Sequence, residues 1–182
     1  MTWNKRSVSA AHFYRLSIIV VFTVGITAFA RVGFSQPAAA PVCNEALWKH
    51  VYAGDPDRFQ SPKDRLRIIE PCITVTGKIF SIKFEADGDR HVRVTVDKQY
   101  KSLLNKMNRS GQKGKLVIEP VCQRIPTQQD TIDEGVCKNY RQKIKIPKKG
   151  TRVRITGVLI EDMEHHWIEL HPVTSVKVLK QS

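Results

Sequence analysis

Histidine and acidic side chains, which can bind metals or transfer protons, are concentrated at two places in the sequence. The later group precedes and enters an alternating segment and comprises Asp162, His165, His166, Glu169 and His171. Because side chains alternate along a β-strand, Trp167, Glu169 and His171 are predicted to share one face. The intervening Ile168 and Leu170 are then expected to face the hydrophobic core.

The earlier group is Asp89 and His91, which follow the turn sequence Asp87-Gly88. Imidazole and carboxylate ligands together suit zinc or another divalent metal, and an open coordination position would let the ion activate water. A metal-dependent hydrolase is therefore one candidate function. Its candidate metal ligands are Asp89, His91, Glu169 and His171. The alternative stays open that the acidic stretch is only a turn and the histidines make structural hydrogen bonds, because ligand spacing along strands is permissive.

A second chemical feature is a run of basic residues with no acidic residue between them. It comprises Lys138, Arg141, Lys143, Lys145, Lys148, Lys149, Arg152 and Arg154. Ile144 and Ile146 alternate with two of these lysines, which predicts one cationic face. Such a face attracts phosphate-bearing polymers through the release of their counterions. The alternative is an ordinary solvated basic surface.

We predict that an anionic ligand binds along this basic run. The predicted contact residues are Lys143, Lys145, Lys148, Lys149, Arg152, Arg154 and Trp167. Proteins that bind single strands add aromatic side chains on which bases stack, and Phe80, Phe84 and Tyr100 are further candidates. Aromatic residues make up only 8% of the chain, so this stacking surface is expected to be small.

The first thirty residues have the features of an export signal. Lys5, Arg6 and Arg15 precede an apolar run over 16–30, which ends in the small-x-small sequence Ala28-Phe29-Ala30. The run is shorter than the roughly 20 residues that a membrane-spanning helix needs. We therefore expect a signal peptide over 1–30, cleavage near Ala30, a flexible leader over 31–42, and a mature periplasmic or extracellular protein without a membrane span. A signal retained as an anchor is the alternative.

All four cysteines, Cys43, Cys72, Cys122 and Cys137, lie beyond this leader. An even number of cysteines in an oxidising compartment favours two disulfides. We predict the pairs Cys43–Cys72 and Cys122–Cys137, because each closes a local loop. A zinc site made of these cysteines is not favoured, since no C-x-x-C pair is present.

The remaining pattern predicts a mainly β fold. Asn44 can cap a short helix that runs to Tyr52, so a helix and loop are expected over 43–64. The expected strands span 73–84, 91–97, 115–122, 151–160 and 167–179, with one or two helical turns near 100–107 and a polar, disulfide-bearing insertion over 123–140. At Gly77 and again at Gly157 the apolar phase shifts, which predicts a bulge or a bend in two strongly curved strands.

This series of strands resembles the OB-fold, the five-stranded Greek-key barrel of many oligonucleotide-binding modules. The resemblance rests on 73–79, 150–157 and 167–178 as first, fourth and fifth strands, and it implies a small barrel over 65–182. The order departs from the OB-fold because the short helix follows the second strand and the insertion takes the place after the third.

Two short motifs carry a narrower resemblance. Asp87-Gly88-Asp89-Arg90-His91 and Trp167-Ile168-Glu169-Leu170-His171-Pro172 are similar to the DGD-x-H turn and W-x-E-[IL]-HP strand of an uncharacterised group of exported bacterial domains. That resemblance implies no established activity. The turn also resembles that of staphylococcal-type nucleases, but Arg90 replaces their threonine, and their later arginine and glutamate are absent after Asp97.

These observations favour an exported OB-fold binding module over an enzyme. Its expected ligand is an anionic polymer: a nucleic acid, an acidic glycan or a phosphorylated envelope polymer. The alternatives are the metal-dependent hydrolase, which would need a divalent metal as cofactor, and a structural envelope domain. No P-loop and no G-x-S-x-G motif is present in the sequence.

Overall fold

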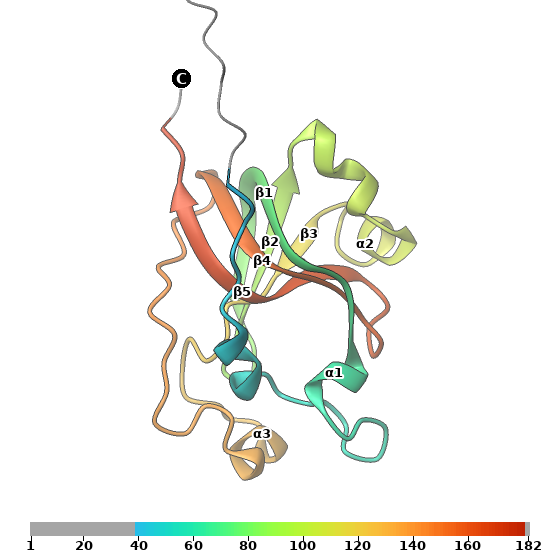
Figure 1. Ribbon diagram of the computed structural model, residues 1–182, viewed down its shortest axis with the longest axis vertical. Helices are drawn as coiled ribbons and strands as arrows, with labels where there is room; N and C mark the ends of the chain where they lie inside the picture. Colours follow the sequence, from blue (N-terminus) through green and yellow to red (C-terminus); the bar gives the residue numbers. More distant parts are fainter. Residues whose placement is uncertain (1–38, 181–182) are drawn as a thin grey trace, which may run out of the picture. The chain divides into compact units, whose positions relative to one another are not determined.

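Five β-strands and a few short helices make up residues 39–180, which the computed structural model describes (Figure 1). The predicted signal peptide and most of the predicted leader lie outside this range. The strands are β1 (Leu66–Phe84), β2 (Arg90–Val96), β3 (Leu116–Ile118), β4 (Arg152–Asp162) and β5 (Ile168–Val178). The α-helices are α1 (Pro62–Arg65), α2 (Lys106–Ser110) and α3 (Gln129–Glu134), and the 3-10 helices are η1 (Glu45–His50) and η2 (Lys98–Leu103). None of the helices within 39–180 is long and apolar enough to cross a membrane.

The strands form one mixed sheet in the order β1-β2-β3-β5-β4, and the sheet closes because β1 also pairs with β4. Only the β3–β5 pair is parallel. The 19-residue β1 serves both neighbours, pairing with β4 over 66–78 and with β2 over 77–84. The mainly β prediction is confirmed. The strand ends differ from the prediction, because β1 begins at Leu66 and β3 has only three residues.

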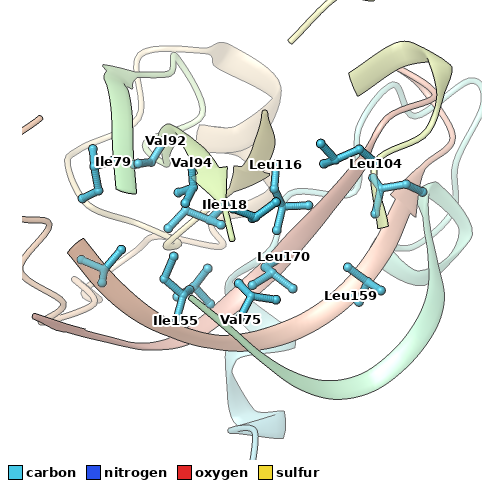
Figure 2. Packing of buried hydrophobic residues seen from close by; sticks show 14 residues of the cluster. Val75, Ile79, Val92, Val94, Leu104, Leu116, Ile118, Ile155, Leu159 and Leu170 are labelled. Atoms are coloured by element: carbon cyan, nitrogen blue, oxygen red, sulfur yellow. The ribbon is translucent and has the colours of Figure 1, made fainter. Parts of the chain in front are cut away.

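The interior of the closed sheet is filled by apolar side chains from alternate positions of all five strands. Figure 2 shows members of this cluster converging, among them Val75, Val94, Ile118, Ile155 and Leu170. All five are 0% exposed. Complete burial of one such side chain stabilises the fold by about 1.5–3 kcal/mol.

A second hydrophobic cluster lies on the other face of β4. Val158 and Ile160 belong to it, whereas Leu159 between them belongs to the interior cluster. Leu47 and Val51 of the N-terminal segment pack there, together with both cysteines of one disulfide. This cluster therefore fastens the N-terminal segment and the insertion to the outer face of the sheet. In Figure 1, η1, α1 and α3 gather at one end of the strands.

Both predicted disulfides are confirmed. Cys43–Cys72 and Cys122–Cys137 join residues whose Cα atoms are 5.5 and 5.4 Å apart, within the usual range for a disulfide. The first ties the start of the described chain to β1, and the second closes the loop that contains α3. The Asn44 cap is also present, since its side chain accepts a hydrogen bond from the backbone of Ala46.

Of the bulge or bend predicted at Gly77, the bulge is wrong in position. The β1–β2 register shifts between Ile79 and Ser81 instead. Gly77 is needed for close approach, because a Cβ atom there would lie 2.5 Å from the carbonyl oxygen of Thr95. At Gly157 the β4–β5 register is irregular on both sides of this residue, but the additional residues lie on β5, and the interior phase of β4 continues to Leu159.

Candidate functional site

A cavity of about 580 Å³ lies where the N-terminal segment and the insertion meet the strands. Tyr52 of the N-terminal segment and Gln128 of the insertion contribute to its wall. We refer to these two segments as the covering segments. Acidic residues outnumber basic ones in the lining. The acidic side chains are Asp55, Glu85, Asp87, Glu119, Asp130, Asp162 and Glu164, and the basic side chains are Arg65, Lys83 and Arg93, with His91 and His165 beside them. The cavity is therefore an acidic compartment in a basic protein.

Behind this wall, His171 lies at the centre of a group of carboxylates. Its Nδ1 is 3.1 Å from Oε1 of Glu169 and 3.3 Å from Oε2 of Glu119, and its Nε2 is 3.4 Å from Oδ2 of Asp89. Glu169 and His171 are 0% exposed, Asp89 is 2% exposed and Glu119 is 8% exposed. We refer to Asp89, Glu119, Glu169 and His171 as the buried cluster.

Strand alternation explains how β5 supplies two members of the buried cluster. Ile168 and Leu170 belong to the interior cluster, so Glu169 and His171 project from the opposite face, as predicted. That face is not open to solvent, because the covering segments lie over it and both polar side chains are completely buried. The first part of β5, from Ile168 to Val173, is thus buried on both faces, one apolar and one charged.

The turn between β1 and β2 supplies Asp89. Its Oδ1 accepts a hydrogen bond from the backbone N–H of Cys122 at 2.6 Å, which connects the turn to the disulfide-bearing insertion. Its backbone N–H donates to Oδ1 of Asp87, an Asx turn that the Asp-Gly sequence favours. Through these two hydrogen bonds Asp89 connects Asp87 in the cavity wall to Cys122 at the start of the insertion.

Two aromatic rings hold the glutamates of the buried cluster. Nδ1 of His91 lies 2.8 Å from Oε1 of Glu119, and its Nε2 lies 3.2 Å from Oε1 of Gln112. The indole Nε1 of Trp167 donates to Oε2 of Glu169 at 2.7 Å. Both rings also line the cavity, as Glu119 does, so the buried cluster directly borders the cavity.

Burial and the closely spaced charges shift the pKa values of several side chains in this region. Burial by itself lowers the pKa of His171, but its contacts with Asp89 and Glu169 outweigh burial and raise the pKa to about 10. Burial raises the pKa of Glu169, and the charge of Glu119 raises it further. Burial and the charges of Asp89 and Glu119 also raise the pKa of Asp87, to about 7. Asp87 in the cavity wall therefore exchanges its proton near neutral pH.

A second acidic group lines the cavity beside Trp167. Oδ2 of Asp162 lies 3.0 Å from Nδ1 of His165, whose ring stacks on Trp167 with centroids 4.3 Å apart. Burial raises the pKa of Asp162, but the hydrogen bond from His165 and the charge of Arg65 more than offset it, so the pKa is lowered. This group is an ion-paired corner of the cavity wall.

Three of the four predicted metal ligands converge, and Glu119, which was not among the predicted ligands, joins them. Asp89, Glu169 and His171 meet in the buried cluster, whereas His91 reaches it only through Glu119. Glu119 was missed by the sequence reasoning. The signal was present, because Leu116 and Ile118 alternate with it and face the interior, which puts Glu119 on the outer side.

The basic run follows the chain from the insertion to β4 without forming a strand between 140 and 148. Its alternation is nevertheless real, since Ile144 and Ile146 pack against the interior cluster while Lys143 and Lys145 are exposed. None of its lysines forms an ion pair within residues 39–180.

Two of the predicted anion-binding residues are engaged elsewhere. The guanidinium of Arg152 forms an ion pair with Asp97 at 2.9 Å, so its charge is partly neutralised. Trp167 lines the acidic cavity, as described above. Arg154 is exposed on β4.

Phe80 is the aromatic side chain that meets the lysines. The Nζ atoms of Lys115 and Lys149 lie 4.9 and 5.5 Å from the centroid of its ring. Lys115 also lines a separate groove of about 410 Å³, together with Lys101 and Arg109. These residues come from η2, α2 and the segment before β3, so the fold enlarges the basic run with lysines and an arginine that the sequence analysis did not include.

We compared the chain with protein families and with curated proteins. No family model matches the chain, and no curated protein matches it.

Proposed function

We propose that this chain is an exported OB-type module that binds an anionic polymer through its basic surface. The basic surface is defined here as three groups of cations: Lys115 and Lys149 over Phe80, Lys101 and Arg109 in the groove that Lys115 also lines, and the exposed Lys143, Lys145 and Lys148 that precede Lys149 in the chain. Exposed cations that have no acidic partner attract polyanions strongly, because binding releases the counterions of the polymer.

The separation of charge over the molecule is the observation that carries this proposal. Of the 17 acidic residues in the chain, seven line the cavity, and Asp89 and Glu169 are buried behind it. More than half of the negative charge is thus withdrawn from the rest of the surface, while only Arg65, Lys83 and Arg93 among the Lys and Arg residues of 39–180 line the cavity. Cleavage of the predicted signal peptide removes Lys5, Arg6 and Arg15 and leaves 27 basic and 17 acidic residues, a net charge of +10 that lies mainly outside the cavity.

The strand order supports the OB-type assignment. An order of β1-β2-β3-β5-β4 with closure between β1 and β4 and a parallel β3–β5 pair agrees with a five-stranded Greek-key barrel. The two motifs shared with the uncharacterised exported domains also meet in space, since Asp89 and His171 are in contact. Their convergence supports the proposal that the chain is a member of that group.

Two disulfides support the proposal of export. Disulfides persist in the periplasm and outside the cell, whereas cytosolic thiols are kept reduced. The predicted signal peptide over 1–30 agrees with that location, and sequencing the N-terminus of the secreted protein tests it. A first residue within a few positions of Arg31 is expected, and an intact Met1 on the secreted protein would contradict cleavage.

The salt dependence of binding tests the polymer proposal. We expect a fluorescent single-stranded oligonucleotide to bind with a log K that falls by about 0.7 per contacted phosphate for each tenfold rise in salt. Replacing Lys143, Lys145, Lys148 and Lys149 together by Gln should weaken binding and flatten this slope. An acidic glycan and a polyphosphate are titrated in parallel, and the polymer with the highest affinity at equal charge density identifies the ligand class.

A second variant with the same loss of charge serves as the control. Lys49, Lys63, Lys83 and Lys177 are exposed and lie outside the basic surface. Replacing these four by Gln should leave the slope nearly unchanged. Equal weakening by both variants would mean that only net charge matters, and the proposed basic surface would then be an ordinary solvated surface.

A further inference from the structure

The buried cluster contains two polar atoms without a hydrogen-bond partner. Among residues 39–180, Oδ2 of Asp89 and Nε2 of His171 make no hydrogen bond, although both residues are almost completely buried. The two atoms face each other at 3.4 Å. A buried donor or acceptor left unsatisfied typically costs about 1–3 kcal/mol, so such a pair indicates a missing partner.

The other atoms of these two side chains are already held in place. Oδ1 of Asp89 accepts from the backbone of Cys122, and Nδ1 of His171 lies between oxygens of Glu169 and Glu119. A histidine that binds a metal commonly donates its second ring N–H to a carboxylate, which fixes the ring and directs the other nitrogen to the ion. His171 has this arrangement, with Glu169 as the carboxylate and Nε2 directed at Asp89.

The separation of the two unpartnered atoms also fits a metal ion between them. Bonds of about 2.0–2.1 Å at a tetrahedral angle place two ligand atoms roughly 3.3–3.4 Å apart. Glu119 offers a third ligand atom, since one atom each from Asp89, Glu119 and His171 can be chosen so that all lie within 4.8 Å of one another. Its Oε2 now lies 3.3 Å from Nδ1 of His171, so the carboxylate has to turn to reach an ion held by Nε2. The nearby Cys122 and Cys137 are not thiolate ligands, because they form a disulfide.

We propose that Asp89, Glu119 and His171 bind one divalent transition metal of the zinc type. One imidazole and two carboxylates suit zinc better than calcium or magnesium, which prefer oxygen ligands alone. Glu169 orients His171, and His91 orients Glu119 through the contact at 2.8 Å. Glu119 also lines the cavity, so the proposed site borders the cavity.

The metal content of the full chain tests this proposal directly. The protein, with both disulfides formed, is stripped with a chelator, dialysed and titrated with zinc chloride, and bound zinc is measured by elemental analysis. One zinc per chain is expected. Cobalt in place of zinc should give the visible absorption bands of a low-symmetry, roughly tetrahedral site. Absence of stoichiometric zinc in the folded wild-type chain would overturn the proposal.

Substitutions assign the ligands. Asp89→Asn keeps the acceptor for the Cys122 N–H but loses the carboxylate, and it should abolish stoichiometric binding. Glu169→Gln, which changes the orienting residue, should weaken zinc binding by about 10–100-fold. Asp130→Asn, at the cavity wall but outside the cluster, is the matched control and should bind zinc as the wild type does. Unchanged binding by folded Asp89→Asn protein would contradict the assignment, and so would equal weakening by all three variants.

Discussion

The buried cluster and the basic surface are the two charged regions of this molecule, and they are built in opposite ways. The buried cluster gathers three carboxylates and an imidazole from β2, β3 and β5 and their flanking turns, and each charge contacts another. The basic surface presents lysines whose charges have no acidic partner within the described residues. The buried cluster pairs its charges with one another and, within residues 39–180, leaves only the buried atoms Oδ2 of Asp89 and Nε2 of His171 without a hydrogen bond, whereas the basic surface leaves its charges for solvent or a ligand.

This difference determines how much each charge contributes to the stability of the fold. In a buried, low-dielectric place two charges interact strongly, and removing one partner leaves the other uncompensated. On an exposed surface the same charges are screened by water and salt and contribute little to stability. Substitutions should therefore change folding in the buried cluster and ligand binding on the basic surface.

The largest expected effect is at the centre of the buried cluster. His171→Ala should lower the free energy of unfolding by about 3–5 kcal/mol, because it leaves buried carboxylates unpaired. Lys145→Ala, on the exposed basic run, should change it by less than about 0.5 kcal/mol. Urea denaturation with both disulfides intact measures both values. If the two variants proved equally stable, the comparison between the regions would fail.

A smaller effect on stability is expected from removing the disulfide of the insertion, one of the two segments that cover the buried cluster. The Cys122–Cys137 disulfide closes a loop with a sequence separation of 15. Replacing both cysteines by Ser should cost about 3 kcal/mol in the chain-entropy model and make the amides of 123–136 exchange faster with solvent. Hydrogen exchange read by mass spectrometry checks the second point. Unchanged exchange in this loop, with β1–β2 as internal reference, would show that the hydrophobic cluster alone holds the cover.

The smallest effect is at the ion pair between Arg152 and Asp97. Hydrogen bonds from Arg152 and Thr76 lower the pKa of Asp97 below its usual value near 4. The stabilisation is then fully present above that usual pKa and is lost as the pH falls through the lower pKa of the folded state. Because the pair is largely exposed, about 0.2–1 kcal/mol is expected.

Comparing the wild type with Asp97→Asn across pH tests this prediction. The difference in unfolding free energy should be constant at neutral pH and disappear at a pH below about 4. Asp57→Asn, an exposed residue without an ion pair among residues 39–180, is the control and should show no such trend. A difference that grew with acidity would reverse the sign and contradict the assignment.

The apolar pattern of β4 shows how sequence reasoning succeeds locally and then misleads. Val153 and Ile155 followed by Val158 and Ile160 suggested that the strand changes phase at Gly157. The interior phase in fact continues to Leu159, and Val158 and Ile160 face the second hydrophobic cluster. A strand covered on both faces has no single apolar phase, and a periodicity argument assumes that only one face is covered.

The sequence by itself determined what short-range chemistry fixes: the number of strands, the two disulfides, the Asn44 cap, and the common outer face of Glu169 and His171. Alternation and turn chemistry act over a few residues, so they can be read without a fold. Only the tertiary structure decided that Glu119 completes the buried cluster and that Lys115 joins Lys149 over Phe80. These contacts depend on the parallel pairing of β3 with β5 and on closure of the sheet, which connect segments far apart in the chain and leave no local signal.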